Sequence, residues 1–551
     1  MKSNWSKMLF VLLLVFTVLL AGCNFGSSSE ESDGDEKTDA TNDGAKSESV
    51  LNLSLYNDIP DLNQILTTDG NSFNVLNNVM EGLFRQDEKH EPEPAMAESY
   101  ELSGDGLTYT FKLRDGIKWS NGDPVTASDF RYSWLRAMHP DTGGAYADIL
   151  YEYIEGAEAF ANGEAEADTV AIKVIDEKTL EVKLTSPTPY FLNLTAFATY
   201  FPLNQKFVEE QGDKFALTHD AILYNGPYVL TSFDQAVGVT MEKNPEYWDF
   251  ENVAIEKVNL KVLKDTSTAL NLYLAGDLDK VYLSSEDVNA YKDNPEFGSE
   301  GEFRTYFLQF NTTKEPFNNV NLRKALQLAF DPEILANTVL NNGSEAALGL
   351  IPTAMAGAEG KTFRELSGDI IKHDYEKAKE YWAKGVEELG GTAPVIELLV
   401  SDDTISKDTG TFLQSEFKKN LGIDVALVTQ PFSGRLDTMR ADNYTVAVNR
   451  WGADYNDAMT YMDLWNNNPT PLRGNYQNPK YDELVSAAKK EADVNKRIQN
   501  LIEAEKILIV EDASIAPLYY DAQTILQKPY VKGIVIHPAG LGLDLKWATL
   551  E

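Results

Sequence analysis

The sequence predicts an α/β protein, and the clearest sign is a strand–helix–strand order in the C-terminal half. Val395–Val400 is predicted as a strand, Phe412–Leu421 as a helix and Ile423–Val428 as a second strand. This order is typical of a βαβ unit. Strands with alternating apolar residues, such as Leu180–Leu184, also occur in the N-terminal half. No repeat of solenoid period is present, so the 551 residues are expected to form several domains of ordinary size.

Composition argues against several classes of protein. The net charge of −38 argues against a nucleic-acid partner, which needs a basic surface. It also argues against charge-driven adsorption to an anionic membrane, although acidity can serve solubility alone. One cysteine cannot form an intrachain disulfide, and five scattered histidines lack metal-ligand spacing, so neither a metal nor another cofactor is predicted.

The N-terminus carries the most specific local signal. Lys2 and Lys7 precede an apolar run, Met8–Leu20, which is too short for a comfortable membrane span. Leu20-Ala-Gly-Cys23 then resembles the lipobox of bacterial lipoproteins. We therefore expect residues 1–22 to be a signal peptide and Cys23 to carry an anchor of lipid chains such as palmitate. The alternative is a plain anchor helix with a chance cysteine.

Residues 23–49 comprise the acylated cysteine and an acidic segment rich in Ser, Gly, Asp and Glu. Such a segment cannot bury enough apolar surface to fold. It predicts a disordered tether between the membrane and a folded body that begins near Val50.

The folded body is predicted to begin with a strand and a helix. Leu51, Leu53 and Leu55 alternate with polar residues, as in a strand. The helix that follows is expected to stop near Gly82 and to bury one apolar face, formed by Phe73, Leu76, Met80 and Leu83.

Residues 107–138 contain several short sequence patterns that are typical of turns. Tyr109–Leu113 is predicted as a half-buried strand and Ile117–Trp119 as a short second strand. Thr126 and Asp129 have the spacing of a capping box, which starts a helix. The inner face of that helix is expected to hold Phe130, Trp134 and Met138. Further elements are predicted over Ile172–Ile175, Val253–Leu263, Thr266–Leu274, Leu322–Phe330 and Tyr375–Leu389.

One stretch near the C-terminus combines a predicted strand with a candidate binding site. Tyr444–Val448 is rich in β-branched and aromatic residues, and the strand is expected to break at Gly452. Asp454 then lies between two rings, Trp451 and Tyr455, which would exclude water from it. A dehydrated carboxylate needs a partner, because an unpaired buried charge is costly. The residues alone leave two interpretations open: a site for an external cation such as an amino terminus, or a solvated acidic turn.

Short motifs follow one another along nearly the whole chain after residue 50. They include Glu81-Gly-Leu-Phe84, Asp105-Gly-Leu-Thr-Tyr-Thr-Phe-Lys-Leu-Arg114, Lys118-Trp-Ser-Asn-Gly-Asp-Pro-Val-Thr126, Asn225-Gly-Pro-Tyr228, Asn244-Pro-Glu-Tyr-Trp248, Ala453-Asp-Tyr-Asn456 and Pro517-Leu-Tyr-Tyr520. In this order they resemble the motifs of the oligopeptide-binding proteins, the extracellular solute-binding proteins of peptide ABC importers.

The resemblance implies a periplasmic-binding-protein-like fold, bilobal with a hinge and built from three domains with mixed sheets. One domain would be discontinuous and a second inserted within it. The three would comprise residues 50–74, 201–303 and 513–551; residues 75–200; and residues 304–512. Two strand-like crossings, near Arg304–Asn311 and Ile515–Asp521, would form the hinge, and the lobes would enclose ligand on closure.

The implied function is that of a lipid-anchored receptor on the extracytoplasmic face of a bacterial cell membrane. It would act as a monomer, enclose oligopeptides and deliver them to the permease subunits of an ABC importer for peptide or protein transport. Two alternatives stay open: a peptide-pheromone receptor or a nickel, haem or sugar binder of the same fold, and a surface hydrolase. No G-x-S-x-G or H-E-x-x-H motif supports the hydrolase, so no enzyme activity is predicted.

The resemblance also implies site residues. Asp454 matches the acid that binds the amino group of the peptide, and Trp451 matches in both ring and spacing. The other matched contact positions are Thr68, Asp69, Gly70, Tyr282, Gln309, Phe432, Gly452 and Tyr455. Aromatic residues at such positions could equally pack in the wall of the cleft.

The positions expected to hold the carboxyl end of the peptide depart from the family's pattern. Enteric members use arginines and a histidine, and two of the arginine positions fall here on Met439 and Val448. Arg440 and Arg450 are nearby, but a one-residue shift on a strand points a side chain to the other face. The sequence therefore does not predict which residues bind the carboxyl end of the peptide, or which peptide lengths the site accepts.

Overall fold

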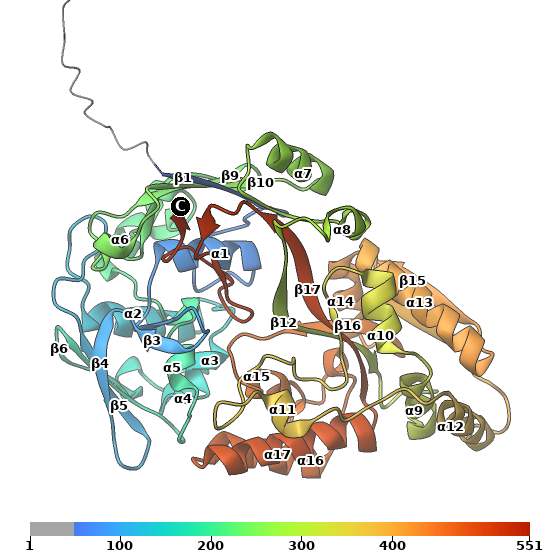
Figure 1. The fold of residues 1–551 in the computed structure, drawn as a ribbon. Coiled ribbons are helices and arrows are strands. Elements are labelled where there is room, and N and C mark those ends of the chain that lie inside the picture. Colours follow the sequence, from blue (N-terminus) through green and yellow to red (C-terminus); the bar gives the residue numbers. More distant parts are fainter. Residues whose placement is uncertain (1–48) are drawn as a thin grey trace, which may run out of the picture. The chain divides into compact units, whose positions relative to one another are not determined.

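A computed structural model describes residues 49–551, so the predicted signal peptide, Cys23 and nearly all of the predicted tether lie outside the described residues. The described chain has three main sheets with helices packed around them, which makes it a mixed α/β protein (Figure 1). No helix within residues 49–551 has the length and apolar character needed to cross a membrane.

The first sheet has four strands in the order β1-β10-β9-β8. They are β1 (Val50–Leu55), β10 (Lys257–Val262), β9 (Gly238–Lys243) and β8 (Tyr228–Asp234). β1 pairs with β10 in parallel, and the other pairs are antiparallel. The predicted strand with alternating leucines is confirmed, and Leu51, Leu53 and Leu55 are all buried.

The second sheet is antiparallel, with four strands in the order β4-β5-β7-β6. They are β4 (Ala97–Leu102), β5 (Thr108–Leu113), β7 (Thr179–Lys183) and β6 (Ile172–Asp176). The predicted capping box is confirmed at the start of α2 (Ala127–Met138), where the Asp129 carboxylate accepts from the Thr126 N–H at 2.8 Å. Ile117–Trp119 is not a strand, because the chain reverses at once and the Trp119 N–H donates to the Asp123 carbonyl.

The third sheet contains seven strands, with the order β11-β17-β12-β16-β14-β15 and a short β13 paired to β17. Their bounds are β11 (Lys280–Tyr282), β17 (Ile515–Gln527), β12 (Phe297–Phe310), β16 (Val446–Gly452), β14 (Ile396–Ser401), β15 (Val425–Gln430) and β13 (Glu345–Ala346). β14 and β15 are parallel and joined through α13 (Thr404–Leu421), which confirms the predicted βαβ unit.

Both predicted crossings lie in the two longest strands, β12 and β17, which run antiparallel side by side (Figure 1). Their register shifts between Gly301 and Thr305, so β12 carries extra residues there. Such a bulge bends a strand locally. The division into three domains stays a prediction, but the sheet joins segments that were assigned to different domains.

The helix α1 (Gly70–Val79) ends earlier than the sequence suggested. The Val79 carbonyl accepts from the Gly226 N–H, and the Glu81 N–H donates to Asn225 Oδ1 at 3.1 Å. These contacts with a distant loop replace the next helical hydrogen bonds. Met80 and Leu83 are buried as predicted, but from the segment after the helix.

The remaining helices and short hairpins complete the fold. The helices are α3 (Asp148–Tyr151), α4 (Ala157–Ala161), α5 (Phe191–Leu194), α6 (Gln205–Gln211), α7 (Thr266–Ala275), α8 (Ser285–Tyr291), α9 (Val320–Leu328), α10 (Pro332–Ile334), α11 (Phe363–Ser367), α12 (Tyr375–Glu388), α14 (Phe432–Arg440), α15 (Met459–Met462), α16 (Pro479–Lys490) and α17 (Val494–Lys506). The paired short strands are β2 (Phe84–Gln86) with β3 (Pro92–Pro94), β18 (Val531–Lys532) with β21 (Thr549–Leu550), and β19 (Val535–Ile536) with β20 (Leu543–Asp544).

Candidate ligand-binding site

Asp454 lies two residues after the end of β16, in a segment held by the loop after β19. The Ala453 N–H donates to the Phe303 carbonyl at 2.7 Å, and the Ala453 carbonyl accepts from the Gly540 N–H at 3.1 Å. Gly540 has a φ of 74°, and a Cβ there would lie 2.9 Å from the Asp454 carbonyl oxygen, so glycine is needed for this close approach. The Asp454 N–H donates to Thr460 Oγ1 at 3.1 Å. The backbone at Asp454 is therefore fixed without any ligand.

The Asp454 side chain is half-buried and lacks a cationic partner. Within residues 49–551, no Lys, Arg or His nitrogen lies within 4.0 Å of its carboxylate. Burial raises the pKa of Asp454 to about 7, and the negative charge of Asp148 adds to the rise. Hydrogen bonds from Tyr146 and Thr460 and the charge of Arg473 oppose it. An acid in this state is stabilised by an incoming cation.

A cavity of about 520 Å³ lies beside this segment. Its lining comes from the end of β1, the start of α1, β11, the bulge of β12, the end of β16 and the loop after β19. Among the predicted site residues it brings together Asp69, Gly70, Tyr282 and Gly452. Asp454 lines a smaller adjacent hollow that shares Gly540 with the cavity. A larger hollow of about 1120 Å³ lies elsewhere, beside α2, and contains none of the predicted site residues.

β16 has one unpaired edge beside this cavity. Its pairing with β12 continues to Gly452, whereas its pairing with β14 reaches only Ala447. The predicted end of the strand at Gly452 is confirmed, since Gly452 is the last residue of β16 and still pairs with β12. No described strand pairs with the β14 side of β16 beyond Ala447.

The backbone directions along β16 show which groups face this open edge. The Ala453 N–H points to β12, whereas the Val448 carbonyl points to the opposite side and accepts from Arg435 at 3.1 Å. Backbone groups alternate in direction along a strand. Those of Arg450 and Gly452 therefore point to the open side, and both residues line the cavity. An extended ligand could pair here as an added strand.

The predicted loop Thr68-Asp69-Gly70 forms the start of α1. Asp69 is the N-cap of the helix, and its carboxylate accepts from the N–H groups of Asn71 and Ser72 at 2.9 and 3.1 Å. Asp69 and Gly70 line the cavity, while Thr68 is exposed and is not part of the lining. The carboxylate of Asp69 thus has a structural role that leaves backbone groups of the loop to face the cavity.

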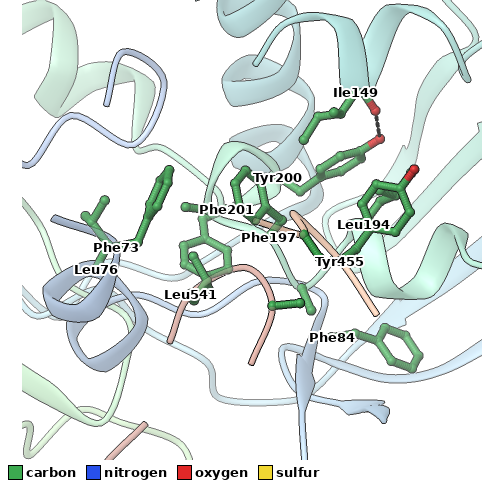
Figure 2. Packing of buried hydrophobic residues seen from close by; sticks show 14 of the residues in the cluster. Phe73, Leu76, Phe84, Ile149, Leu194, Phe197, Tyr200, Phe201, Tyr455 and Leu541 are labelled. Carbon is green, nitrogen blue, oxygen red and sulfur yellow. Dashed lines mark hydrogen bonds between the residues drawn. The ribbon is translucent and has the colours of Figure 1, made fainter. Parts of the chain in front are cut away.

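The two rings that flank Asp454 in sequence have different neighbours. Trp451 is half-buried, and the Arg473 guanidinium lies over its ring at 5.0 Å. Tyr455 is buried in the main apolar cluster, part of which is drawn in Figure 2, and its ring stacks on Tyr190 at 5.3 Å. Shielding of Asp454 by the two rings stays a prediction, and the contacts of Tyr455 show that its ring also packs against Tyr190.

Gln309 and Phe432 lie outside the lining of the cavity. Gln309 is fully buried; its Nε2 donates to Tyr444 Oη at 2.9 Å and its Oε1 accepts from Asn449 at 3.0 Å. Phe432 begins α14 and is largely exposed, with the guanidinium of Arg450 over its ring at 4.9 Å. Gln309 thus links β12 to β16, and Phe432 reaches the cavity only through Arg450.

The positions at which enteric relatives carry arginines are apolar and buried here. Met439 packs with a small cluster around Tyr444, and Val448 packs in the core of the third sheet. Of the two nearby arginines, Arg440 is exposed and pairs with Asp437 at 3.1 Å. Arg450 lines the cavity and donates to Tyr306 Oη at 2.6 Å.

Several groups that shape the site were not foreseen from the sequence. Tyr146 and Asp148 reach Asp454 from a segment far away in the chain, and Arg473 reaches it from the short helix η8 (Pro471–Arg473). Only the fold brings these segments together, and no local motif marks them.

The described residues contain no group of three or more His, Cys, Asp and Glu side chains that could hold a metal ion. Two of the scattered histidines do meet: His90 Nδ1 and His537 Nδ1 are 3.1 Å apart, and His537 lines the cavity.

The fold has mixed sheets joined by two long paired strands, and its cavity lies near the open edge of β16 and the start of α1. These features are those of a periplasmic-binding-protein-like solute receptor. A model of the bacterial extracellular solute-binding proteins, family 5, matches residues 91–471, and the chain belongs to this family.

Known relatives are similar over nearly the whole chain. The oligopeptide-binding protein OppA of Bacillus subtilis (strain 168) is 34% identical over 554 residues, with 98% of each chain covered. The dipeptide-binding protein DppE of the same organism is 36% identical over 540 residues, covering 98% of this chain and 97% of that one. The solved structure of the pheromone receptor PrgZ, described with its mode of peptide binding, has a TM-score of 0.80 at 35% identity and covers 92% of this chain and 100% of its own.

Proposed function

We propose that the protein is a lipid-anchored extracellular receptor that encloses oligopeptides and delivers them to an ABC importer. The observation that carries the proposal is the open edge of β16 beyond Ala447, where Arg450 and Gly452 line a cavity of about 520 Å³. An extended peptide satisfies such an edge whatever its side chains are, because it pairs through main-chain groups. The relatives named for oligopeptide and dipeptide binding support the same ligand class.

Asp454 supplies the second fixed contact in this proposal. Every peptide with a free amino terminus carries an ammonium group, and Asp454 offers a carboxylate without a cationic partner among the described residues. A hydrogen bond to a charged group contributes about 1.5–3 kcal/mol. That contribution fixes the register of the peptide, while strand pairing and enclosure provide most of the affinity.

Enclosure is proposed to occur between lobes that move about β12 and β17. Two neighbouring strands with a bulge between Gly301 and Thr305 support a hinge that absorbs small backbone changes. Small-angle scattering should show a decrease in the radius of gyration when peptide is added. An unchanged radius at saturating peptide would contradict closure but not binding.

The experiment that tests the ligand class has two parts. Native mass spectrometry of the purified protein should show peptides that are recovered intact in a one-to-one complex. Calorimetry should then show that free peptides bind well and that the same peptides bind poorly when N-acetylated. Equal affinity for the free and N-acetylated peptides would contradict the proposed role of Asp454. Cleaved peptides would indicate a hydrolase instead.

The lipid anchor is proposed from the Leu20-Ala-Gly-Cys23 motif alone. Mass spectrometry of detergent-extracted protein should find acyl chains on Cys23, and Cys23→Ser should release the protein from the membrane. Retention of the Cys23→Ser protein at the membrane would contradict the anchor and leave peptide binding untouched.

A second candidate role is a pheromone receptor of the same fold, which the similarity to PrgZ favours. Both roles use the same peptide site, so binding experiments do not separate them. Deletion of the gene separates them: a nutritional receptor is needed for growth on peptides, whereas a signalling receptor is needed for the response to one peptide.

A further inference from the structure

Arg473 is a half-buried arginine without an acceptor. Its guanidinium lies over the Trp451 ring at 5.0 Å, but among the described side chains (residues 49–551 without the side chain of Ser433) no carboxylate lies within 4.0 Å of it and no hydrogen bond joins it to an acceptor. Other buried arginines have acceptors, either neutral oxygens or carboxylates. Arg435, for example, has no carboxylate partner but donates to Ser401 Oγ at 2.9 Å. Arg497 binds Asp457 at 2.6 Å, and Arg364 binds Glu505 at 2.5 Å. Arg473 therefore differs from these arginines, because it has no acceptor among the described side chains.

The Trp451 ring next to it presents a second unused donor. Trp451 Nε1 is buried and has no hydrogen-bond partner among the described residues. Buried donors are almost always satisfied, so an unsatisfied one points to a missing partner. Two neighbouring donors that both lack an acceptor, one of them fully charged, fit a carboxylate.

The unpaired charges of Arg473 and Asp454 influence each other but do not meet. The charge of Arg473 lowers the pKa of Asp454, and the charge of Asp454 raises the pKa of Arg473, so each favours the charged form of the other. The two side chains form no ion pair and are therefore more than 4.0 Å apart. A ligand that carries an ammonium group and a carboxylate a short distance apart could satisfy both side chains at once.

The strand geometry places the Arg473 donors on the side of β16 away from the large cavity. Arg450 and Gly452 line that cavity, and Trp451, which lies between them, does not. Side chains alternate between the two faces of a strand. A peptide added to the open edge would alternate in the same way, so one of its first two side chains would point toward Arg473.

We propose that Arg473 and Trp451 Nε1 form a carboxylate subsite next to the ammonium site at Asp454, which makes the receptor selective for peptides with a carboxylate close to the amino terminus. The carboxylate comes either from an Asp or Glu side chain at the first or second position or from the carboxyl end of a dipeptide. The inference rests on the proposed peptide-binding function and adds a specificity to it.

Calorimetry with matched peptides tests the subsite and separates the two sources. One series compares Glu-Ala-Ala-Ala with Gln-Ala-Ala-Ala and Ala-Glu-Ala-Ala with Ala-Gln-Ala-Ala. A second compares Ala-Ala with its C-terminal amide. We expect about a tenfold or larger preference for the carboxylate form in at least one series, because a hydrogen bond to a charged group is lost in the other form. The series that shows the preference identifies the source.

Variants of Arg473 show whether the preference arises there. Arg473→Gln should abolish the preference, so that the carboxylate and neutral members of each pair bind with equal affinity. Arg473→Lys, which keeps the charge, should retain part of it, and Trp451→Phe should reduce it. The matched control is Arg440→Gln, since Arg440 is exposed and lies outside the cavity. If Arg473→Gln fails to fold, the Lys and Phe variants still report on the subsite.

Each result has a definite meaning. A carboxylate preference that persists unchanged in Arg473→Gln overturns the subsite, and so does the lack of any preference in a protein that binds free peptides. In both cases the proposed function stands. Failure of the unchanged protein to bind any of the peptides, free or amidated, overturns the proposed function and the subsite with it.

Discussion

Asp454 and Asp457 lie three residues apart in one segment and meet opposite environments. The Asp457 carboxylate accepts from the Arg497 guanidinium at 2.6 and 2.8 Å and also from the Met459 N–H at 2.8 Å. Asp454 has no cationic partner among the described residues, and its pKa is raised to about 7. The segment thus contains one acid that the protein pairs by itself and one that has no cationic partner among the described residues.

The core-facing part is also the more heavily packed one. Tyr455 stacks on Tyr190, and Arg497 lies over the Tyr190 ring at 4.9 Å. The ion pair of Asp457 and the stacked rings therefore form one unit that ties the segment to α17 and to the start of α5. This anchoring lets Asp454 remain unpaired without loosening the segment, since its backbone position is set by its neighbours.

The largest expected effect comes from breaking the structural ion pair. Asp457→Asn leaves the buried Arg497 without its counter-charge, which should lower the free energy of unfolding by about 3 kcal/mol. Urea unfolding measures this loss. The control is Asp437→Asn, which removes an exposed ion pair with Arg440 and should change stability by less than about 1 kcal/mol. Equal losses in the two variants would show that the Asp457 pair does not hold the segment.

Asp454→Asn should have the opposite profile, with weaker binding and no loss of stability. Removal of the charge that meets the ammonium group should weaken binding of free peptides about tenfold or more, as measured by calorimetry at pH 8. The folded-state pKa of Asp454 lies above its usual value, so its ionised form destabilises the folded protein as pH rises through that range. A neutral Asn should therefore leave the thermal midpoint unchanged or raise it at pH 8. A lower midpoint with unchanged affinity would assign Asp454 to structure.

The contrast between these two acids shows which features the sequence could and could not predict. Alternating leucines and the capping box of Thr126 and Asp129 are local patterns, so β1 and the start of α2 were predicted correctly. The acid at position 454 could be identified from its motif. Its lack of a partner could not, because that depends on where Arg497 and Arg473 lie in space.

Long-range packing also explains the other differences. The motif around Asp454 did not indicate that Tyr455 stacks on Tyr190, because that ring is brought by a distant segment. Gln309 matches a contact position, yet its side chain bonds to Tyr444 and Asn449 on neighbouring parts of the fold. A residue type and its spacing fix a position along the chain, whereas the direction of the side chain is decided by what packs against it.

The pH dependence of binding should also distinguish the ligand-facing acid. A bound ammonium group requires ionised Asp454, whose pKa of about 7 is set by burial and by Asp148 against Tyr146, Thr460 and Arg473. The affinity for free peptides should therefore fall about tenfold from pH 8 to pH 6, with proton release on binding in that range. The Asp454→Asn variant provides the control and should lose this slope. If the affinity of the unchanged protein did not depend on pH, the amino terminus of the peptide would not bind at Asp454.

The smallest expected effect comes from Tyr455→Phe, which tests the boundary between the two parts of the segment. The substitution keeps the ring that stacks on Tyr190 and removes only the hydroxyl group. Because Tyr455 faces the core, the affinity for peptide should stay within about twofold of its original value, and stability should change by less than about 1 kcal/mol. Calorimetry and urea unfolding of the same preparation measure both. If Tyr455→Phe lost about as much affinity as Asp454→Asn while its stability stayed unchanged, Tyr455 would be a ligand-contacting residue and the binding site would extend to position 455.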